Sequence, residues 1–253
     1  MHLIPQAQQI LDLVEKRKNR ERFGLFVVEG EKAISENINR FKYLLYSKKS
    51  ETVDNANTLG IPTYNVSHNV MAKLSQVETP QGIIGVSRIL DHKLEDLFVK
   101  KNQFFVFAVE LQDPGNLGTI IRIADSVGAD GVIIARNSVD PYNPKVVRST
   151  MGSIFHLPIV HDVEVSEALD IFSNKDLKVI ASDLLGTKSY WDADFKKGFV
   201  LLVGNEGGGL SKELLERADE IVKIPMLGKA ESLNAAMATS IILYEGIRQR
   251  LND

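Results

Sequence analysis

The alternation of apolar runs with helical segments after Gln103 constrains the fold of this 253-residue chain more than any other feature. Apolar runs predict strands at 104–109, 131–135, 158–160, 177–182, 199–203 and 221–224. Helical periodicity is predicted at 116–127, 144–152, 164–173 and 211–217, and from about residue 232. Near-continuous apolar strands separated by helices are typical of a parallel sheet covered on both faces. The sequence therefore predicts an α/β fold with a mostly parallel sheet.

The first ninety residues carry a smaller pattern of their own. Strands are predicted at 25–28, 43–46, 63–66 and 82–86, and helices around 10–14 and at 31–37 and 69–74. Between Asp91 and Asn102 the sequence becomes charged and loses strong periodicity, which is typical of a linker. We therefore expect a small α/β domain at 1–90, a linker at 91–102 and a larger domain at 103–253.

Composition and charge exclude several classes of protein. The chain has no cysteine, which excludes disulfides, thiolate catalysis and cysteine-ligated zinc. The N-terminus is too polar for a signal peptide and no apolar run would span a bilayer, so we expect a soluble cytoplasmic protein with no membrane partner. The net charge of −3 argues against a broad nucleic-acid-binding surface. One basic cluster is nevertheless either a nucleic-acid contact or a solvated helix end: Lys16, Arg17, Lys18, Arg20 and Arg22.

Three segments at strand-to-helix junctions carry residues suited to binding a polar ligand. They are Asn116-Leu-Gly-Thr-Ile-Ile-Arg122, Gly204-Asn-Glu-Gly-Gly-Gly-Leu210 and Ile224-Pro-Met-Leu-Gly-Lys-Ala-Glu-Ser-Leu-Asn234. The first follows turn residues, so Asn116 is alternatively a helix N-cap, and Arg122 is close enough to Asp125 in sequence to touch it. In the third segment we expect Ser232 to cap the final helix.

The glycine-rich segment at 204–210 matches neither of two common nucleotide-binding loops. A Walker A loop requires lysine where Leu210 stands. The dinucleotide fingerprint Gly-x-Gly-x-x-Gly fails at Glu206 or, starting from Gly207, at Lys212. Glycines do permit positive φ and close approach of a ligand to the backbone. The segment is therefore a ligand loop of another kind or a plain tight turn.

In this order the three segments resemble the motifs of the SpoU (TrmH-type) RNA ribose 2′-O-methyltransferases, of the knotted SPOUT class. That pattern is Asn-x-Gly-x-x-x-Arg, then Gly-x-Glu-Gly-x-Gly, then Pro-x-x-Gly followed by Ser-Leu-Asn, and each expected residue is present. Two departures, Gly208 and Ala235-Ala236, lie outside the expected catalytic positions. The resemblance extends over 143–153 and 155–158, and 26–32 and 78–82 resemble the family's N-terminal substrate-binding domain, which is similar to ribosomal protein L30e.

The resemblance implies a deep trefoil knot within about residues 178–253, a homodimer, and S-adenosyl-L-methionine as cofactor without any metal. The catalytic residues it implies are Arg122, Asn116, Glu206, Ser232 and Asn234. The cofactor-binding residues it implies are Ser182, Asp183, Leu202, Val203, Gly204, Asn205, Gly207, Ile224, Met226, Ser232 and Leu233. Candidate RNA contacts are the basic cluster at 16–22 together with Lys145 and Arg148.

The implied reaction transfers a methyl group from S-adenosylmethionine to a ribose 2′-hydroxyl of RNA. Family accounts give the hydroxyl proton to the arginine that matches Arg122. Alternatively, Arg122 orients the hydroxyl while solvent or a neighbouring group accepts the proton, since a neutral guanidine is costly. We expect ribosomal RNA as substrate because of the N-terminal domain. A tRNA methyltransferase, or a non-catalytic RNA-binding or ribosome-assembly protein on the same scaffold, is the alternative.

Overall fold

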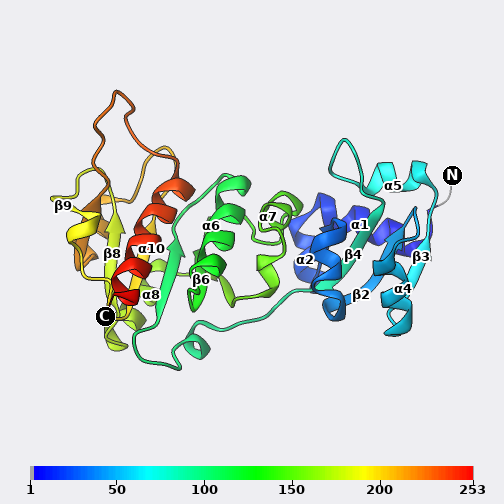
Figure 1. The fold of residues 1–253 in the computed structure, drawn as a ribbon, viewed down its shortest axis with the longest axis horizontal. Helices are drawn as coiled ribbons and strands as arrows, with labels where there is room; N and C mark the ends of the chain where they lie inside the picture. The colour runs from blue at the N-terminus through cyan, green and yellow to red at the C-terminus, as the bar shows by residue number, and fades with distance from the viewer. Residues whose placement is uncertain (1–2, 253) are drawn as a thin grey trace. The chain divides into compact units, whose positions relative to one another are not determined.

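The computed structural model describes residues 3–252, which form two compact units. Unit 1 contains the chain up to Leu90 together with Asp140–Phe155, and unit 2 contains Asp91–Val139 and the chain from His156 onward. Each unit has its own sheet (Figure 1). Segment 140–155 packs with unit 1 although its sequence lies inside the expected larger domain. As functional domains, 1–90, the linker 91–102 and 103–253 stay a prediction.

Unit 1 is built on a four-stranded sheet of order β1-β4-β2-β3 in which β4 runs antiparallel to both of its neighbours. Its strands are β1 (Leu25–Glu29), β2 (Phe41–Tyr46), β3 (Thr63–Asn65) and β4 (Ile83–Arg88). Its helices before the second sheet are α1 (Pro5–Glu15), α2 (Arg17–Phe23), α3 (Glu31–Ser35), α4 (Glu51–Thr58) and α5 (His68–Leu74). The sequence did not predict α4, because its buried residues Thr52, Val53 and Ala56 give a weak apolar signal.

The two faces of this sheet are covered by different parts of the chain. On one face Ile10 and Leu13 of α1, three residues apart and so on one side of the helix, pack in a core with Val27 of β1. On the other face the ring of Phe26 lies 4.9 Å from that of Tyr142 and 5.7 Å from that of Phe155. These aromatic contacts fix segment 140–155, with helix α7 (Pro144–Ser149), to unit 1.

Unit 2 contains a seven-stranded, all-parallel sheet of order β7-β6-β5-β10-β8-β11-β9. Its strands are β5 (Phe104–Ala108), β6 (Gly131–Ala135), β7 (Ile159–Val163), β8 (Lys178–Ser182), β9 (Lys188–Ser189), β10 (Phe199–Val203) and β11 (Glu220–Lys223). The prediction of a parallel α/β sheet is confirmed. Strand β9 was not predicted, because two residues leave no periodicity to read.

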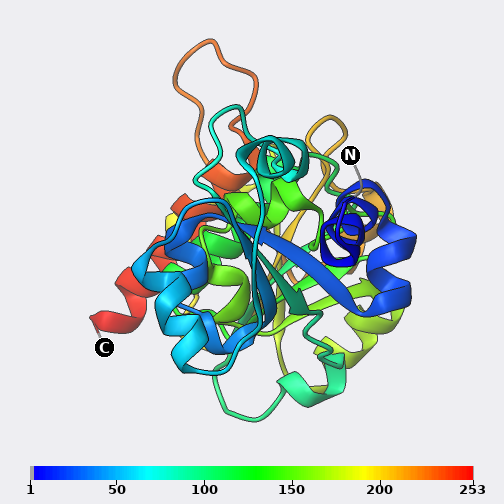
Figure 2. The same ribbon diagram turned by 90° about the vertical axis from the view of Figure 1, so that its right-hand side faces the viewer.

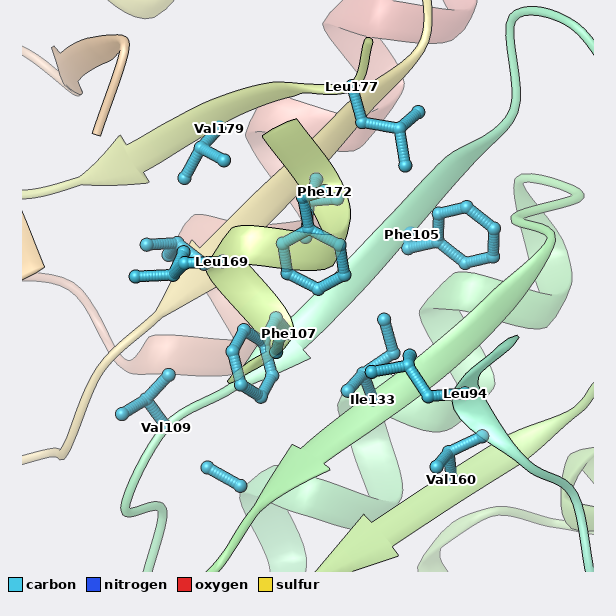
Figure 3. Close-up of a cluster of buried hydrophobic side chains, with 14 of the residues drawn as sticks. Leu94, Phe105, Phe107, Val109, Ile133, Val160, Leu169, Phe172, Leu177 and Val179 are labelled. Carbon is cyan, nitrogen blue, oxygen red and sulfur yellow. The ribbon is translucent and has the colours of Figure 1, made fainter. Parts of the chain in front are cut away.

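Helices cover both faces of this larger sheet. They are α6 (Pro114–Ser126), α8 (Val165–Asn174), α9 (Lys212–Arg217) and α10 (Ala235–Leu251). On one face, Phe172 of α8 packs against Phe107 of β5, with ring centroids 5.7 Å apart (Figure 3). Side chains alternate between the faces along β5, so Phe104 points to the other face, where the Arg250 guanidinium of α10 lies 4.6 Å from its ring. Helices α6 and α10 pack side by side (Figure 1).

The segment expected to be a linker is packed on unit 2. It forms a short 3₁₀ helix at Leu94–Leu97, and both leucines are buried in the same core as Phe105. The side chain of Gln103 donates to the carbonyl of Leu97 at 2.9 Å. In the sequence these two leucines are surrounded by charged residues, so they gave no recognisable apolar pattern. No helix within residues 3–252 combines the length and apolar character needed to cross a bilayer.

Candidate functional site

The parallel sheet of unit 2 brings the three sequence segments to one edge, the edge formed by the carboxyl ends of its strands. The first segment follows β5, the second follows β10 and the third follows β11, and all three strands run in the same direction. Figures 1 and 2 show the third segment, in orange, extending beyond this edge between β11 and α10. Ligands of open α/β folds bind outside the carboxyl ends of the strands. The arrangement therefore defines one candidate site.

A hydrogen-bonded chain of three side chains joins the three segments. The Glu206 carboxylate accepts from Asn116 Nδ2 at 3.0 Å, and Asn116 Oδ1 accepts from Asn234 Nδ2 at 2.8 Å. Because a carboxylate only accepts, it fixes which atom of the Asn116 amide faces it. Asn116 then presents its oxygen to Asn234. One negative charge thus orients two amides, and the three side chains come from three distant parts of the chain.

The same carboxylate is held by backbone donors after β5. Its oxygens accept from the backbone N–H of Gln112 at 3.2 Å and of Asp113 at 3.1 Å. Burial alone would raise the pKa of Glu206, but hydrogen bonds from Asn116, from its own backbone, and from Gln112 and Asp113 lower the pKa below its ordinary value. Glu206 is therefore ionised at neutral pH and serves as an acceptor rather than as an acid.

Two helix caps at this edge differ from those that the sequence predicted. The cap of α6 is Asp113, whose Oδ1 accepts from the N–H of Asn116 at 2.8 Å, so Asn116 is not the N-cap. The cap of α10 is Asn234, whose Oδ1 accepts from the N–H of Ala236 at 3.0 Å. The expectation that Ser232 caps this helix is wrong, because α10 begins three residues later, at Ala235.

The glycine-rich loop after β10 is closed by its own hydrogen bonds. Asn205 forms a two-residue antiparallel bridge with Gly209, and its Oδ1 accepts from the N–H of Gly207 at 2.8 Å. A Cβ at Gly204 would stand 2.7 Å from the N–H nitrogen of Leu210 and closer still to the carbonyl of Gly209, so only glycine fits. By contrast, a Cβ at Gly208 meets nothing within 4 Å.

The residues expected to hold S-adenosylmethionine lie at or beside this edge, but two of them are buried. Leu202 and Val203 are buried in β10, so only their backbone groups remain for a ligand. Asp183 Oδ1 accepts from the N–H of Leu185 at 2.8 Å and fixes the loop after β8. The other expected positions are Ser182 at the end of β8, Gly204, Asn205 and Gly207 in the glycine loop, and Ile224, Met226, Ser232 and Leu233 after β11.

The chemistry of this edge fits a cofactor with one apolar and one polar part. The side chains of Leu185, Leu227 and Leu233 are exposed around the loops after β8 and β11. Exposed apolar side chains that surround polar backbone turns suit an adenine ring and an apolar linker better than a chain of phosphates. Asp183 and the backbone groups of 204–209 supply polar partners. The residues present therefore fit S-adenosylmethionine.

Arg122 lies exposed on α6, six residues after Asn116. It forms no hydrogen bond or ion pair with any residue between 3 and 252, so its guanidinium is available to a ligand. The contact with Asp125 that the sequence suggested is not made. Asp125 instead pairs with His156, whose Nδ1 lies 2.8 Å from Asp125 Oδ2.

The basic cluster at 16–22 divides into structural and exposed residues. Arg20 is only 4% exposed, and its Nη2 lies 2.6 Å from Asp140 Oδ2, so the expectation that it contacts RNA is wrong. Arg17 Nε lies 2.6 Å from Glu21. Lys16, Lys18 and Arg22 are exposed and remain candidate contacts.

The two candidate contacts on α7 also lie in unit 1. Lys145 is exposed, and the Arg148 guanidinium donates to the carbonyl of Gln76 at 3.4 Å. Sequence reasoning missed the backbone donors of Gln112 and Asp113, although the Asp-Pro-Gly turn was a signal that the chain reverses there.

Comparisons with known proteins agree with this geometry. Residues 103–244 match the SpoU rRNA Methylase family, and residues 5–85 match the MRM3-like substrate binding domain. The 23S rRNA (guanosine(2553)-2′-O)-methyltransferase RlmP of Bacillus subtilis (strain 168) is 34% identical, covering 90% of each chain. The 23S rRNA (uridine(2479)-2′-O)-methyltransferase of Streptomyces viridochromogenes is also 34% identical, over 97% of this chain and 90% of that one.

A solved structure extends the likeness to three dimensions. The SpoU methyltransferase AviRb from Streptomyces viridochromogenes, in complex with the cofactor AdoMet, aligns with a TM-score of 0.89 at 33% identity. The alignment covers 98% of this chain and 99% of that one. The family match spans more than half of the sequence and the relatives extend over nearly all of it, so the chain belongs to the SpoU rRNA methylase family.

Proposed function

We propose that this protein transfers the methyl group of S-adenosylmethionine to a ribose 2′-hydroxyl of 23S ribosomal RNA. The observation that carries the proposal is the chain of hydrogen bonds from Glu206 through Asn116 to Asn234, which unites the three motifs of the family. The relatives support ribosomal RNA, since two of them are named as 23S rRNA 2′-O-methyltransferases. Their printed nucleotides differ, so neither target position is transferred to this chain.

Bound at this edge, S-adenosylmethionine supplies an electrophilic methyl group on a sulfonium, so the reaction consists mainly of aligning a nucleophile and removing its proton. The Glu206–Asn116–Asn234 chain sets the glycine loop and the loop after β11 relative to α6. The free guanidinium of Arg122 offers a planar set of N–H donors for a phosphate or a ribose oxygen. Positioning of the cofactor loops and alignment of the RNA ribose are thereby assigned to different residues.

This division of roles is tested by replacing Arg122. The variant Arg122→Ala should lose methyl transfer to 23S rRNA by about 100-fold or more, since Arg122 acts on the reacting ribose. It should bind S-adenosylhomocysteine with unchanged affinity in calorimetry. Lost cofactor affinity in this variant would contradict the assignment. Transfer to purified tRNA but not to 23S rRNA would favour the tRNA alternative, and failure of the wild-type protein to bind S-adenosylhomocysteine would favour a non-catalytic RNA-binding protein.

We also propose the trefoil knot and the homodimer expected of the family. The order of strands supports the knot, since β10 lies between β5 and β8 while β11 lies beyond β8. The surface of α10 supports the homodimer, because Met237, Tyr244 and Leu251 recur every seven residues and are 63%, 52% and 79% exposed. Charged replacements at Met237 and Tyr244 should convert a dimer to a monomer in analytical ultracentrifugation, and an unchanged sedimentation coefficient would contradict the proposed interface.

Unit 1 is proposed to bind the RNA. Its family match to a substrate binding domain supports this role, as do the exposed cations Lys16, Lys18 and Arg22. Charge reversal at these three residues should weaken RNA binding and reduce the slope of log K against log salt by about 2 to 3, since each phosphate contact contributes about 0.9. An unchanged slope would show a solvated surface instead. A ribosomal RNA substrate also supports a cytoplasmic location, which fractionation of cells would test.

A further inference from the structure

Gln112, in the loop between β5 and α6, is exposed, yet its side-chain amide is fixed in one orientation. Its Nε2 donates to the backbone carbonyl of Glu110 at 3.1 Å and to that of Asn137 at 2.8 Å. Because a carbonyl oxygen only accepts, the amide nitrogen must face both carbonyls, and its two hydrogens are then used. The amide oxygen, Oε1, has no partner among residues 3–252. Gln112 therefore presents an oriented, unpaired hydrogen-bond acceptor to solvent.

The two carbonyls that fix this amide belong to residues with an uncommon backbone conformation. The φ angle is 55° at Glu110 and 69° at Asn137. Six non-glycine residues between 3 and 252 have positive φ, and these two direct their carbonyls at the same amide. Asparagine tolerates this conformation, whereas glutamate rarely adopts it. Backbone strain persists where the surroundings fix it and concentrates at functional sites, so the orientation of the Gln112 amide is a candidate functional feature.

Hydrogen bonds join Gln112 to the three-segment site through both its backbone and its side chain. Its backbone N–H donates to Glu206, the carboxylate that orients Asn116. The Glu110 carbonyl that accepts from Gln112 Nε2 also accepts from Asn205 Nδ2, at 2.9 Å. The two amide nitrogens share this acceptor and so lie within about 6 Å of each other. The side chain of Gln112 is thus held against the glycine loop.

The order of strands places this acceptor away from the loops that fit the cofactor. Those loops follow β8, β10 and β11, whereas Gln112 and Asn137 follow β5 and β6, which lie on the other side of β10 in the sheet. RNA offers N–H donors only on its bases, since phosphate carries no hydrogen and ribose carries only hydroxyls. Each of the four bases has at least one N–H on its Watson–Crick edge. A nucleobase is therefore the part of the substrate that matches the Gln112 acceptor.

We propose that Gln112 is a specificity-determining residue whose Oε1 accepts a hydrogen bond from an N–H on the Watson–Crick edge of the nucleobase whose ribose is methylated. This inference rests on the proposed function and states how the same site selects its nucleotide. Because both N–H donors of the amide are occupied, Gln112 does not turn to present a donor instead. A base without an N–H at this edge leaves Oε1 unpaired and is disfavoured.

A base analogue that keeps the reacting ribose tests this contact. In a 23S rRNA fragment, the nucleotide that the wild-type protein methylates is replaced by purine ribonucleoside if it is a purine, or by pyrimidin-2-one ribonucleoside if it is a pyrimidine. Both analogues keep the ring and the 2′-hydroxyl but carry no N–H on the Watson–Crick edge. The wild-type protein should methylate the natural fragment with a kcat/KM about five- to tenfold above that of the analogue fragment, the effect of one lost hydrogen bond.

Two replacements remove the acceptor in different ways. Gln112→Lys still has donors for both carbonyls but no acceptor. Gln112→Met adds no charge and lacks both the N–H donors and the amide oxygen. Each variant should methylate the natural and the analogue fragment with kcat/KM values within about twofold of each other, because neither can form the proposed bond. A replacement that only distorted the loop would slow both fragments equally and would keep the wild-type ratio.

The control is Asn174→Leu, which removes an exposed amide at the end of α8, before β8 and so at the opposite edge of the sheet. It should keep both the wild-type rate and the wild-type ratio of the two fragments. Calorimetry with S-adenosylhomocysteine provides a second readout. Gln112→Met should bind this product with wild-type affinity, since Gln112 is assigned to the RNA rather than to the cofactor.

Three results would overturn the inference while leaving the proposed function intact. The first is a wild-type ratio below about twofold, and the second is a wild-type ratio that both Gln112 variants retain. The third is a loss of S-adenosylhomocysteine affinity of about tenfold in Gln112→Met, which would place the acceptor against the cofactor instead. A wild-type protein that methylates no RNA would overturn both the inference and the proposed function.

Discussion

Replacing Arg20 should lower the stability of unit 1 far more than replacing any exposed cation of the same cluster. Arg20 donates through Nε and Nη2 to Asp140 Oδ2, at 2.8 and 2.6 Å, and through Nη1 to the carbonyl of Leu13 at 2.6 Å. The side chains of Arg20 and Asp140 are 5% and 10% exposed. Arg20→Met keeps much of the apolar stem but leaves Asp140 buried without its counter-charge.

The magnitude follows from this burial. Removing one partner of a buried ion pair costs about 3–5 kcal/mol, because the remaining charge is left uncompensated. The N–H of Tyr142 still donates to Asp140 at 2.9 Å, which places the expected loss at the lower end of that range. A loss of about 3 kcal/mol lowers the melting temperature by about 6–12 °C for a chain of this size. Lys18→Met, at an exposed position, should change stability by about 0.5 kcal/mol or less.

Urea unfolding followed by circular dichroism measures both variants, with Asp140→Asn and the double variant completing a mutant cycle. RNA binding at several salt concentrations provides the second readout. Under native conditions Arg20→Met should keep the wild-type salt slope, whereas Lys18→Met should reduce it by about 0.9 if it contacts a phosphate. An Arg20→Met protein of wild-type stability but with a reduced salt slope would refute the reasoning and return Arg20 to the RNA-binding surface.

Asn116→Asp should abolish methyl transfer and should bind the cofactor more weakly than Asn116→Ala does, because a second carboxylate would face Glu206 across 3.0 Å. Equal cofactor affinities of the two variants in calorimetry would contradict this. The lowered pKa of Glu206 means that the stability this carboxylate contributes is fully present above its unfolded pKa and is lost as pH falls through the lower folded pKa. The stability difference between wild type and Glu206→Gln should therefore shrink on acidification from pH 7 to about pH 3, and a pH-independent difference would refute it. Gly204→Ala should destabilise the protein, since its Cβ meets the backbone of Gly209 and Leu210, whereas Gly208→Ala should be tolerated; melting temperatures of the pair decide.

Much of the fold follows from local signals. The apolar runs predicted β5, β6 and β10 nearly to the residue, because strands buried on both faces leave no polar positions. The parallel order of these strands also explains why the three motif segments meet at one edge. Helix α4 and strand β9 escaped prediction, because neither carries enough buried apolar residues to produce a period.

The contacts within the site required the structure. The burial of Arg20 depends on Asp140, 120 residues away, and no local pattern distinguishes it from the neighbouring cations. The direction of the Glu206–Asn116–Asn234 chain depends on which amide atom faces the carboxylate. The carbonyl of Glu110, which has positive φ, accepts from Gln112 in the same loop and from Asn205 in the glycine loop. Each of these features depends on a contact between residues far apart in the chain, and such contacts cannot be predicted from one sequence alone.

The most direct test of the account is to incubate the purified protein with 23S ribosomal RNA and methyl-labelled S-adenosylmethionine, digest the RNA and identify the labelled nucleoside. We predict label on a 2′-O-methylated ribose at one position of the 23S rRNA, and none when Arg122→Ala replaces the wild type. Label on a base, on tRNA alone, or on no RNA at all would contradict the claim that this site methylates a ribose of 23S ribosomal RNA.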